Sequence, residues 1–474
     1  MHFYRLSLVV VVAVTSIIAV VSDCPPHGCS LTAIDVAADG SEKEALTILR
    51  KSLLKTSSSD DHDADNRPNT SHSLQNALET LSLAGDDSSV TMTLRGYKGG
   101  PPEAQINQDR AILIRPFRIS STERQIAEKE PVTQQLLGVF DGHGTGGEQT
   151  SQHALEQVPQ LLAEKLKAIA ERDTDTPLHE QEEAVKQALV EVFLEVDQTD
   201  PTKGAAGCTA TVILQLGPKL YIANAGDSIS FVGVYVSKKD DSAGSNDANN
   251  GNTKERPLQQ QVRIVYETRE DKPDLPDEHA RITAAGGHVN IPANPEVDVP
   301  RAYHVDKDGR LLWGLAMSRS LGDWAVQGVI AEPIVDVLDV FEIVQTAMAA
   351  HVETCEASIT SDDDDADDDN DDKNKYCEAL DPSQVHIFAV SATDGMMDEL
   401  PSNYIGSIVA RALFDRTIRL HPLSAAEHLI LEAAKGWNRL YNGGYRDDIA
   451  IAAAIIYSGE SILLSQSRNS TNLR

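Results

Sequence analysis

Aspartates recur along this chain next to apolar runs, so each would lie at the end of a buried strand. They stand in these short motifs: Asn107-Gln108-Asp109-Arg110, Val139-Phe140-Asp141-Gly142-His143-Gly144, Ala225-Gly226-Asp227-Ser228, Ala392-Thr393-Asp394-Gly395-Met396-Met397-Asp398 and Arg446-Asp447-Asp448-Ile449. Carboxylates gathered at strand ends cannot all stay charged unless a cation lies among them. Ligands that are all oxygen favour a hard divalent ion such as Mg²⁺ or Mn²⁺. The pattern therefore predicts a two-metal hydrolase.

Other short motifs lie between these aspartates. They are Gly207-Cys208-Thr209-Ala210, Lys272-Pro273, Arg281-Ile282 with Ala285-Gly286-Gly287, Ser318-Arg319-Ser320-Leu321-Gly322-Asp323, and Ala331-Glu332-Pro333. Each one alone is weak evidence, because a short motif arises easily by chance. Taken together and in order, from about Val90 to about Tyr457, they make the chain resemble the metal-dependent Ser/Thr protein phosphatases of the PPM, or type-2C, family.

The resemblance implies a role for the principal acids. The Asp141 carboxylate would bridge two metal ions, and the Gly142 carbonyl would bind one of them. Asp394 and Asp447 would be direct ligands of the other metal, while Asp109 would act through water. Such a pair of ions lowers the pKa of a bridging water and binds the phosphoryl oxygens. The implied cofactor is Mg²⁺ or Mn²⁺, two ions per site with a weaker third.

Two more acids and one histidine complete the expected site. Asp227 and Asp398 match the third, weaker metal position of the family. His143 follows the bridging acid by two residues, where a turn at the strand end would let it donate a proton to the leaving-group oxygen. The alternative for the histidine is a structural hydrogen bond, and for each aspartate a turn cap or a surface acid. We interpret all of them as functional because they occur as an ordered set.

Two departures from the family pattern concern substrate binding. The acid that many members carry just before the Asp109 position is Gln108 here, which weakens one water-mediated metal contact. Many members also have a phosphate-binding arginine a few residues upstream, but Pro101–Ile106 contains none. Lys98 is the nearest cation, and it lacks the bidentate fork of arginine.

The apolar pattern predicts strands in neighbouring pairs with helices in blocks between them, which is typical of an α+β fold. Strands are expected at Val90–Leu94, Leu136–Phe140, Thr209–Leu216, Leu220–Ala225, Ile229–Val236, Val385–Ala392 and Ile449–Tyr457. Apolar residues from Ala184 to Val196 share one helical face, and Ser424 with Glu427 predicts a capping box that opens a helix. The family resemblance implies a four-layer α-β-β-α sandwich of two antiparallel sheets, with the metals at one edge between the sheets.

Residues 1–22 have the features of a secretory signal. Arg5 precedes the apolar run Leu6–Val21, and small residues then meet Asp23. The run is short for a membrane-spanning helix, which needs roughly 20 residues, but a retained signal anchor is the alternative. The expected location is therefore the lumen of the secretory pathway or the outside, or a single-pass membrane anchor with the catalytic domain on that side.

The remaining boundaries follow from composition. Residues 23–89 are expected to be a low-complexity linker, residues 90–458 one phosphatase domain with insertions at about 237–258 and 340–383, and residues 459–474 a tail. The formal charge of −32 argues against nucleic acid as a partner. The acidic run Asp362–Asp372 is interpreted as a solvated loop, with docking of a basic partner as the alternative.

The five cysteines fit an oxidising compartment. Cys24 and Cys29 form one close pair, and Cys355 and Cys377 bracket the acidic run, so two disulfides and one buried thiol, Cys208, are expected.

The expected activity is hydrolysis of phosphoserine and phosphothreonine in proteins by a monomeric enzyme that contacts a membrane only if the N-terminal segment is retained. A small-molecule phosphomonoesterase and a non-catalytic metal-binding regulator are the alternatives. The complete set of Asp141, Asp394 and Asp447 argues against the regulator.

Overall fold

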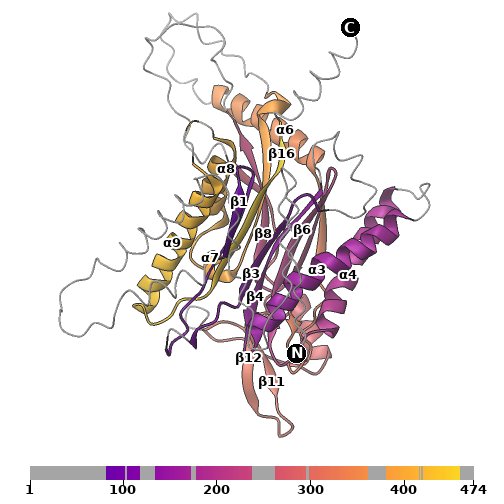
Figure 1. Cartoon of the computed structure of the whole chain (residues 1–474), viewed down its shortest axis with the longest axis vertical. Helices are drawn as coiled ribbons and strands as arrows, with labels where there is room; N and C mark the ends of the chain where they lie inside the picture. Colours follow the sequence, from indigo (N-terminus) through magenta and orange to yellow (C-terminus); the bar gives the residue numbers. More distant parts are fainter. Residues whose placement is uncertain are drawn as a thin grey trace, which may run out of the picture.

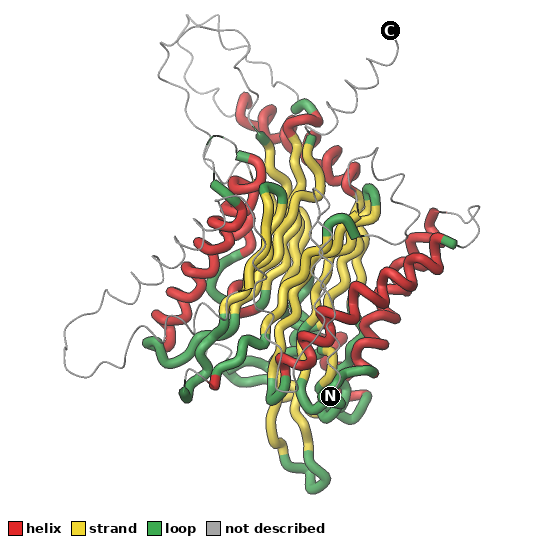
Figure 2. The backbone as a smooth tube through the Cα atoms, in the orientation of Figure 1, coloured by secondary structure: helices red, strands yellow, loops and turns green. Residues whose placement is uncertain are grey.

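Two antiparallel sheets lie face to face in the computed structural model, with helices on both outer sides (Figure 1). The structure describes residues 82–101, 104–117, 134–171, 178–237, 262–294, 298–360, 380–415, 417 and 420–459. Figure 2 shows the same arrangement as a block of strands between two groups of helices.

The first sheet has six strands in the order β1-β2-β16-β15-β8-β9. Their bounds are Ser82–Asp86 (β1), Ser89–Leu94 (β2), Ile449–Ser458 (β16), Val385–Ala392 (β15), Ile229–Val236 (β8) and Val262–Glu267 (β9). The second sheet has the order β13-β5-β4-β6-β7-β14, and β3 pairs with β4 at its side. Their bounds are Leu321–Gly322 (β13), Gly207–Cys208 (β5), Gln134–His143 (β4), Ala210–Leu216 (β6), Lys219–Ala225 (β7), Ile334–Asp339 (β14) and Asp109–Ile114 (β3).

The helices cover the outer faces in pairs. α3 (Gly147–Ala170) and α4 (Leu178–Gln198) pack on the second sheet, where Leu189 and Phe193 share one hydrophobic cluster with Phe140. α8 (Ser402–Phe414) and α9 (Pro422–Tyr441) pack on the first sheet, as the buried residues of those helices and of β2, β15 and β16 show. Between the two sheets a third cluster joins inward-facing side chains of both, among them Val139, Ile213, Val232, Ile387 and Ala452.

These layers confirm the expected four-layer α-β-β-α sandwich. The sequence predicted these strands and helices from the spacing of their apolar residues, every second residue in strands and every three to four in helices. The spacing is clear because each element buries one face or both in these clusters. The helix expected at Ala184–Val196 is the middle of α4, and the hairpin formed by β6 and β7 pairs from Ala210↔Ala225 to Leu216↔Lys219.

The N-terminal boundary of the domain was placed too late. The expected linker, residues 23–89, includes β1, which pairs with β2 from Ser82↔Thr93 to Asp86↔Ser89. The two-residue turn Asp87–Ser88 closes this hairpin. A short strand with few large apolar residues gave little sequence signal.

The first half of the expected insertion at 340–383 is helical, and this helix was not predicted. Val340–Thr360 forms the helix α6, and Val340, Val344 and Ala347 bury one face against the cluster between the sheets. Their spacing is that of one helical stripe, which the neighbouring acidic run obscured. Cys355 lies on this helix.

The capping box at Ser424 is wrong as well. α9 begins at Pro422, and the His421 side chain accepts a hydrogen bond from the Leu423 amide at 3.1 Å. Ser424 therefore lies inside the helix, and proline at the first helical position sets its start.

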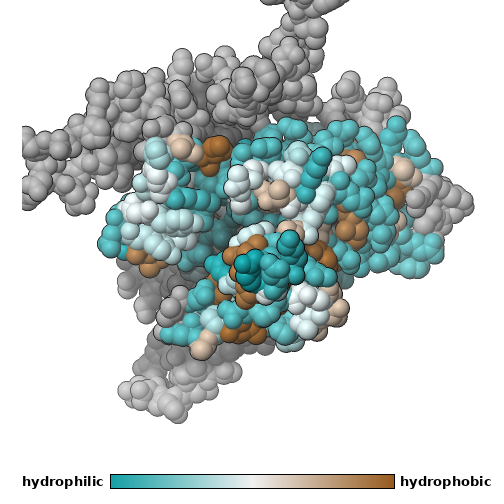
Figure 3. Space-filling view, turned by 90° about the horizontal axis from the view of Figure 1, so that it is seen from below, coloured by the Kyte–Doolittle hydropathy of each residue, from teal (hydrophilic) through white to brown (hydrophobic). Residues whose placement is uncertain are grey.

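A third, three-stranded sheet was not predicted. It consists of β10 (His288–Asn290), β11 (Arg301–Val305) and β12 (Leu311–Leu315), and β11 and β12 project from one end of the molecule (Figure 1). Figure 3 looks onto this end and shows a mostly hydrophilic surface with separate hydrophobic patches.

Several sequence expectations lie outside the described residues. They are the N-terminal signal and linker up to residue 81, the insertion at about 237–258 from residue 238 on, the acidic run, three of the cysteines (Cys24, Cys29 and Cys377) and the tail from residue 460. Within the described ranges, Cys208 is a free, buried thiol, as expected. No helix in those ranges is both long and apolar enough to cross a bilayer.

Candidate active site

Strand register brings the first two acids together. β3 pairs with β4 so that Asp109 lies opposite Asp141, and both side chains are buried. Thr393, which follows β15 in the other sheet, donates a hydrogen bond to Asp109 Oδ2 at 2.7 Å. The Thr393 hydroxyl in turn accepts from the amide of Ala450 at 2.9 Å. The site therefore joins the ends of strands from both sheets.

Asp394 reaches the same place from the first sheet. It follows β15 and begins the short helix α7 (Asp394–Met397). The next residue must be glycine, because a Cβ at Gly395 would lie 1.8 Å from the carbonyl oxygen of Asp448. The close approach packs α7 against the segment that carries Asp447, and the charge of Asp394 lies close enough to act on the Asp141 carboxyl group.

Asp447 has the most partners of the expected ligands. Its Oδ1 lies 2.7 Å from Lys98 Nζ and accepts the Asp448 amide at 2.8 Å. Its Oδ2 accepts the Tyr445 hydroxyl at 2.7 Å. The neighbouring Asp448 is buried and accepts backbone amides from Gly96 and Gln108, so it joins two loops.

The remaining two acids, Asp227 and Asp398, are also near Asp394, since their charges raise its pKa. Asp227 follows Gly226, whose φ of 123° suits glycine, and its Oδ2 pairs with Lys272 Nζ at 2.8 Å. Asp398 ends α7, and its amide bonds to the Asp394 carbonyl at 2.9 Å. Burial raises the pKa of Asp398 to about 6, and the charge of Asp227 adds to the increase against the opposing charge of Lys272.

The acids of the cluster have raised pKa values, because they are buried close to one another with few positive charges nearby. Burial raises the pKa of Asp109 and of Asp141 well above the usual range, and neighbouring carboxylates raise both further. Burial and the charges of Asp447 and Asp227 raise the pKa of Asp394 to about 7. One buried oxygen of each of Asp109, Asp227 and Asp394 has no hydrogen-bond partner among the residues that the structure describes.

The acids of this cluster are the candidate ligands of a metal ion. Within the described residues, no group of three or more carboxylate, histidine or cysteine side chains is already closed around one point. Two of the acids are paired with lysines instead, Asp447 with Lys98 and Asp227 with Lys272. The open oxygens and the donor set, which is all oxygen, fit a hard divalent cation.

His143 turns away from the acids toward another element. Its Nε2 lies 2.6 Å from Asp323 Oδ2, and Ser320 donates to the same oxygen at 2.7 Å. Burial alone would lower the pKa of His143, but the charge and hydrogen bond of Asp323 outweigh it and raise the pKa. The buried Nδ1 has no partner among the described residues. Asp323 thus orients the ring and favours its protonated form.

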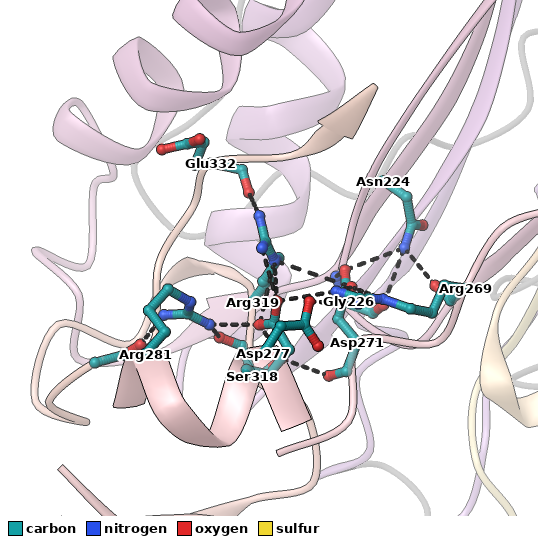
Figure 4. A network of polar contacts seen from close by, with 11 residues as sticks. Asn224, Gly226, Arg269, Asp271, Asp277, Arg281, Ser318, Arg319 and Glu332 are labelled. Atoms are coloured by element: carbon teal, nitrogen blue, oxygen red, sulfur yellow. Dashed lines mark hydrogen bonds and ion pairs between the residues drawn. The ribbon is translucent and has the colours of Figure 1, made fainter. Parts of the chain in front are cut away.

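A network of arginines and acids lies beside the Asp227 turn (Figure 4). Asp271 Oδ2 accepts from the Gly226 amide at 3.2 Å, and its other oxygen bonds to Arg269 Nη2 at 3.0 Å. Arg319 reaches from the same network to Glu278 and to the carbonyl of Glu332. The network fixes the turn that places Asp227.

All eight residues expected from the sequence thus lie at this site. The structure adds Lys98, Lys272, Asp323, Tyr445 and Thr393, to which the sequence assigned no contact with the acids. Asp323 and Thr393 belong to sequence motifs that pointed to the site, Ser318–Asp323 and Ala392–Asp398, but the motifs did not predict what these two side chains contact. Arg110, which follows Asp109 in the sequence, donates to Gln152 and to backbone carbonyls.

Known proteins give an independent comparison. Residues 118–365 match the family described as Protein phosphatase 2C. Probable protein phosphatase 2C 73 of Oryza sativa subsp. japonica is 26% identical over 347 residues, which cover 68% of this chain and 65% of that protein. Probable protein phosphatase 2C 41 of Arabidopsis thaliana is 26% identical over 386 residues, or 79% of this chain and 84% of that protein.

A solved structure supports the fold. The serine-threonine phosphatase 2C from Toxoplasma gondii superposes with a TM-score of 0.50 at 17% identity, over 79% of this chain and 97% of that one. The family match spans more than half of the 474 residues. The chain therefore belongs to the protein phosphatase 2C family of protein serine/threonine phosphatases.

Proposed function

We propose that this chain hydrolyses phosphoserine and phosphothreonine in proteins with water activated by two bound Mg²⁺ or Mn²⁺ ions. The observation that carries the proposal is the set of buried oxygens without a partner, Asp109 Oδ1, Asp227 Oδ1 and Asp394 Oδ1. An unpaired buried polar atom costs about 1–3 kcal/mol, and more when charged. A fold that keeps three of them in one cluster is best explained by a cation that they bind.

The residues that would hold the ions follow from their positions. Asp141 lies between Asp109 and Asp394 and is suited to bridge, with the Gly142 carbonyl beside it. Asp394 and Asp447 would complete the second position. When bound, the ions supply an activated water and neutralise charge on the phosphoryl oxygens.

Three outer acids would support those ligands. Asp109 is fixed by Thr393 and would act through water. Asp227 and Asp398 are also near Asp394 and would form the third, weaker position.

His143 would act as the general acid that protonates the leaving group. Asp323 holds Nε2 and favours the charged ring, so the proton available for the leaving-group oxygen is the one on Nδ1, a buried atom that the ring must turn toward the substrate. A general acid placed in this way contributes typically about 10²–10⁴-fold. The serine or threonine alkoxide is a poor leaving group, so this proton matters for a phosphoprotein substrate.

The test is phosphate release by the full chain with Mn²⁺, offered phosphoserine and phosphothreonine peptides against small phosphate esters. Asp141→Asn should reduce turnover by more than about 100-fold, beyond the loss typical of an outer partner. The exposed Glu180→Gln on α4 is the matched control and should keep full activity. Near-wild-type turnover of Asp141→Asn would contradict the metal assignment, and activity only on small esters would favour a small-molecule phosphomonoesterase.

We also propose that the domain acts on the luminal or outer side of the secretory pathway, on the strength of the apolar run Leu6–Val21 after Arg5. Peptide mapping without reduction, on secreted material, should find Cys355 joined to Cys377. Two free thiols at these positions would sink the proposal.

A further inference from the structure

We propose that Lys98 is a tethered counter-ion that competes with metal ions for Asp447, and that this competition sets the metal affinity of the site. The inference rests on the proposed function, because it assumes that Asp447 is a metal ligand. It goes further by assigning a role to a residue that ordinarily would only repel a cation.

The contacts of Lys98 place its ammonium group within the acid cluster. Nζ lies 2.7 Å from Asp447 Oδ1 and 3.6 Å from Asp448 Oδ2, and it also interacts with the charge of Asp141. Burial alone would lower the pKa of Lys98, but these carboxylates raise it well above its usual value. The ammonium therefore carries a full charge beside the expected bridging acid.

The backbone around Lys98 is fixed by loops that surround the site. Tyr97 and Arg446 exchange two backbone hydrogen bonds, at 2.7 and 2.8 Å. The Gly96 amide donates to the buried Asp448 Oδ1 at 2.5 Å, and the Lys98 amide donates to Gln105 Oε1 at 3.0 Å. Lys98 thus starts from a fixed point, unlike a lysine on an open surface. Its side chain, 33% exposed, keeps room to swing outward.

Asp447 differs from Asp109, Asp227 and Asp394 because each of its oxygens has a partner among the described residues. Its Oδ1 is taken by Lys98 and the Asp448 amide, and its Oδ2 by Tyr445. Asp394, by contrast, keeps Oδ1 free. Each carboxylate oxygen has two lone pairs, and those of Oδ1 already face two donors. A divalent ion that binds Asp447 through Oδ1 must therefore displace one of these partners, and the ammonium is the partner that a cation repels.

Lys272 shows what a lysine does when it does not block the site. It pairs with Asp227 Oδ2 at 2.8 Å and with Glu270 at 3.3 Å, while Asp227 Oδ1 stays open. Lys272 neutralises one acid from the side. Lys98 instead shares Asp447 with two other donors, so neither oxygen of that ligand is left without a partner. The two lysines therefore differ in effect although both are cations in one cluster.

The decisive measurement is Mn²⁺ binding by isothermal titration calorimetry to the metal-stripped full chain. Lys98→Met should bind Mn²⁺ at least about 10-fold more tightly than wild type, which is within the range by which outer-shell residues alter metal affinity. Lys98→Arg keeps the charge and should stay within a few-fold of wild type. Lys167→Met, in an exposed ion pair on α3, is the matched control and should change nothing.

A second measurement needs no variant. Limited acetylation of the wild-type chain, followed by mass spectrometry, should modify Lys98 faster when Mn²⁺ is present, because the metal displaces the ammonium from Asp447 and leaves its side chain more accessible to the reagent. Lys167 should react at the same rate with and without the metal.

The outcomes separate the inference from the proposed function. An unchanged or weaker Mn²⁺ affinity of Lys98→Met, or equal labelling of Lys98 with and without Mn²⁺, overturns the inference while wild-type metal binding stands. An unchanged affinity with a raised KM for phosphopeptides assigns Lys98 to the substrate and overturns it too. Failure of wild type to bind Mn²⁺ at all overturns both proposals.

Discussion

Two groups of buried carboxylates in this molecule solve the same problem in opposite ways. Glu278 is 1% exposed, and it accepts hydrogen bonds from Arg269, Arg281, Arg319 and Ser318. Burial alone would raise the pKa of Glu278, but bonds from Arg319, Ser318 and Arg281 lower it to about 2. Burial among other acids raises the pKa of Asp394 to about 7 instead.

The difference separates structure from function. The charge of Glu278 is fully compensated by residues of the chain itself, so its network needs nothing from outside (Figure 4). Asp394 and its neighbours keep open oxygens and few cations, which is costly unless a ligand binds. The closed network also supports the open one, since it holds the turn of Gly226 through Asp271.

The His143–Asp323 pair joins a buried acid to a histidine that it keeps charged. Its loss should have the largest effect on activity of the changes predicted here. His143→Gln should slow hydrolysis of a phosphoserine peptide by about 10²–10⁴-fold, because its leaving group needs the proton. An activated aryl phosphate, whose leaving group barely needs it, should lose far less. Steady-state kinetics on both substrates checks this.

Asp323→Asn is the companion variant, because it keeps the shape but removes the charge that holds the ring. It should act in the same direction as His143→Gln with a smaller loss. Equal losses of His143→Gln on both substrates would show that the ring is structural.

The second prediction sets the two groups of acids directly against each other. Glu278→Gln removes the charge that compensates three arginines, so it should lower the free energy of unfolding by ~3–5 kcal/mol. Asp394→Asn removes a charge that the metal-free chain does not compensate. It should leave the metal-free protein as stable as wild type or more stable, while Mn²⁺ stabilises it less.

Urea unfolding with and without Mn²⁺ measures both variants. Glu180→Gln, exposed on α4, gives the baseline for a lost surface carboxylate. If Asp394→Asn destabilised the metal-free protein as strongly as Glu278→Gln does, the comparison between an open and a closed group of acids would be untenable.

The elements that could be predicted from the sequence are those with a strong period and full burial. β4 and β15 are near-continuous apolar runs, and the acids that follow them, Asp141 and Asp394, mark the strand ends. Local sequence could place each acid at a strand end, but the family resemblance was needed to bring the strands together. In the structure, the pairing of β3 with β4 places Asp109 directly opposite Asp141.

What escaped prediction depends on contacts between distant segments or on weak periodicity. The Lys98–Asp447 pair joins residues near opposite ends of the domain, and no local pattern encodes it. β10 has three residues and leaves most of its surface exposed, so it carries little apolar signal. α6 has a clear apolar stripe, but the acidic run beside it dominated the composition.

The smallest of the expected effects concerns pH and isolates the closed network. Because the folded pKa of Glu278, about 2, lies below its unfolded value of 4.5, its stabilisation is complete above the unfolded value. It is lost as pH falls toward the folded one. The difference in unfolding free energy between wild type and Glu278→Gln should therefore be constant near pH 6 and shrink by up to ~3 kcal/mol on approaching pH 2. Other titrating acids are common to both proteins and cancel in this difference.

Asp277→Asn, which loses only an exposed ion pair with Arg269, should differ from wild type by less than ~1 kcal/mol over the same range. Urea midpoints of the metal-free proteins between pH 6 and pH 3 measure the curve, and parallel curves for wild type and Glu278→Gln would refute a charged, compensated Glu278.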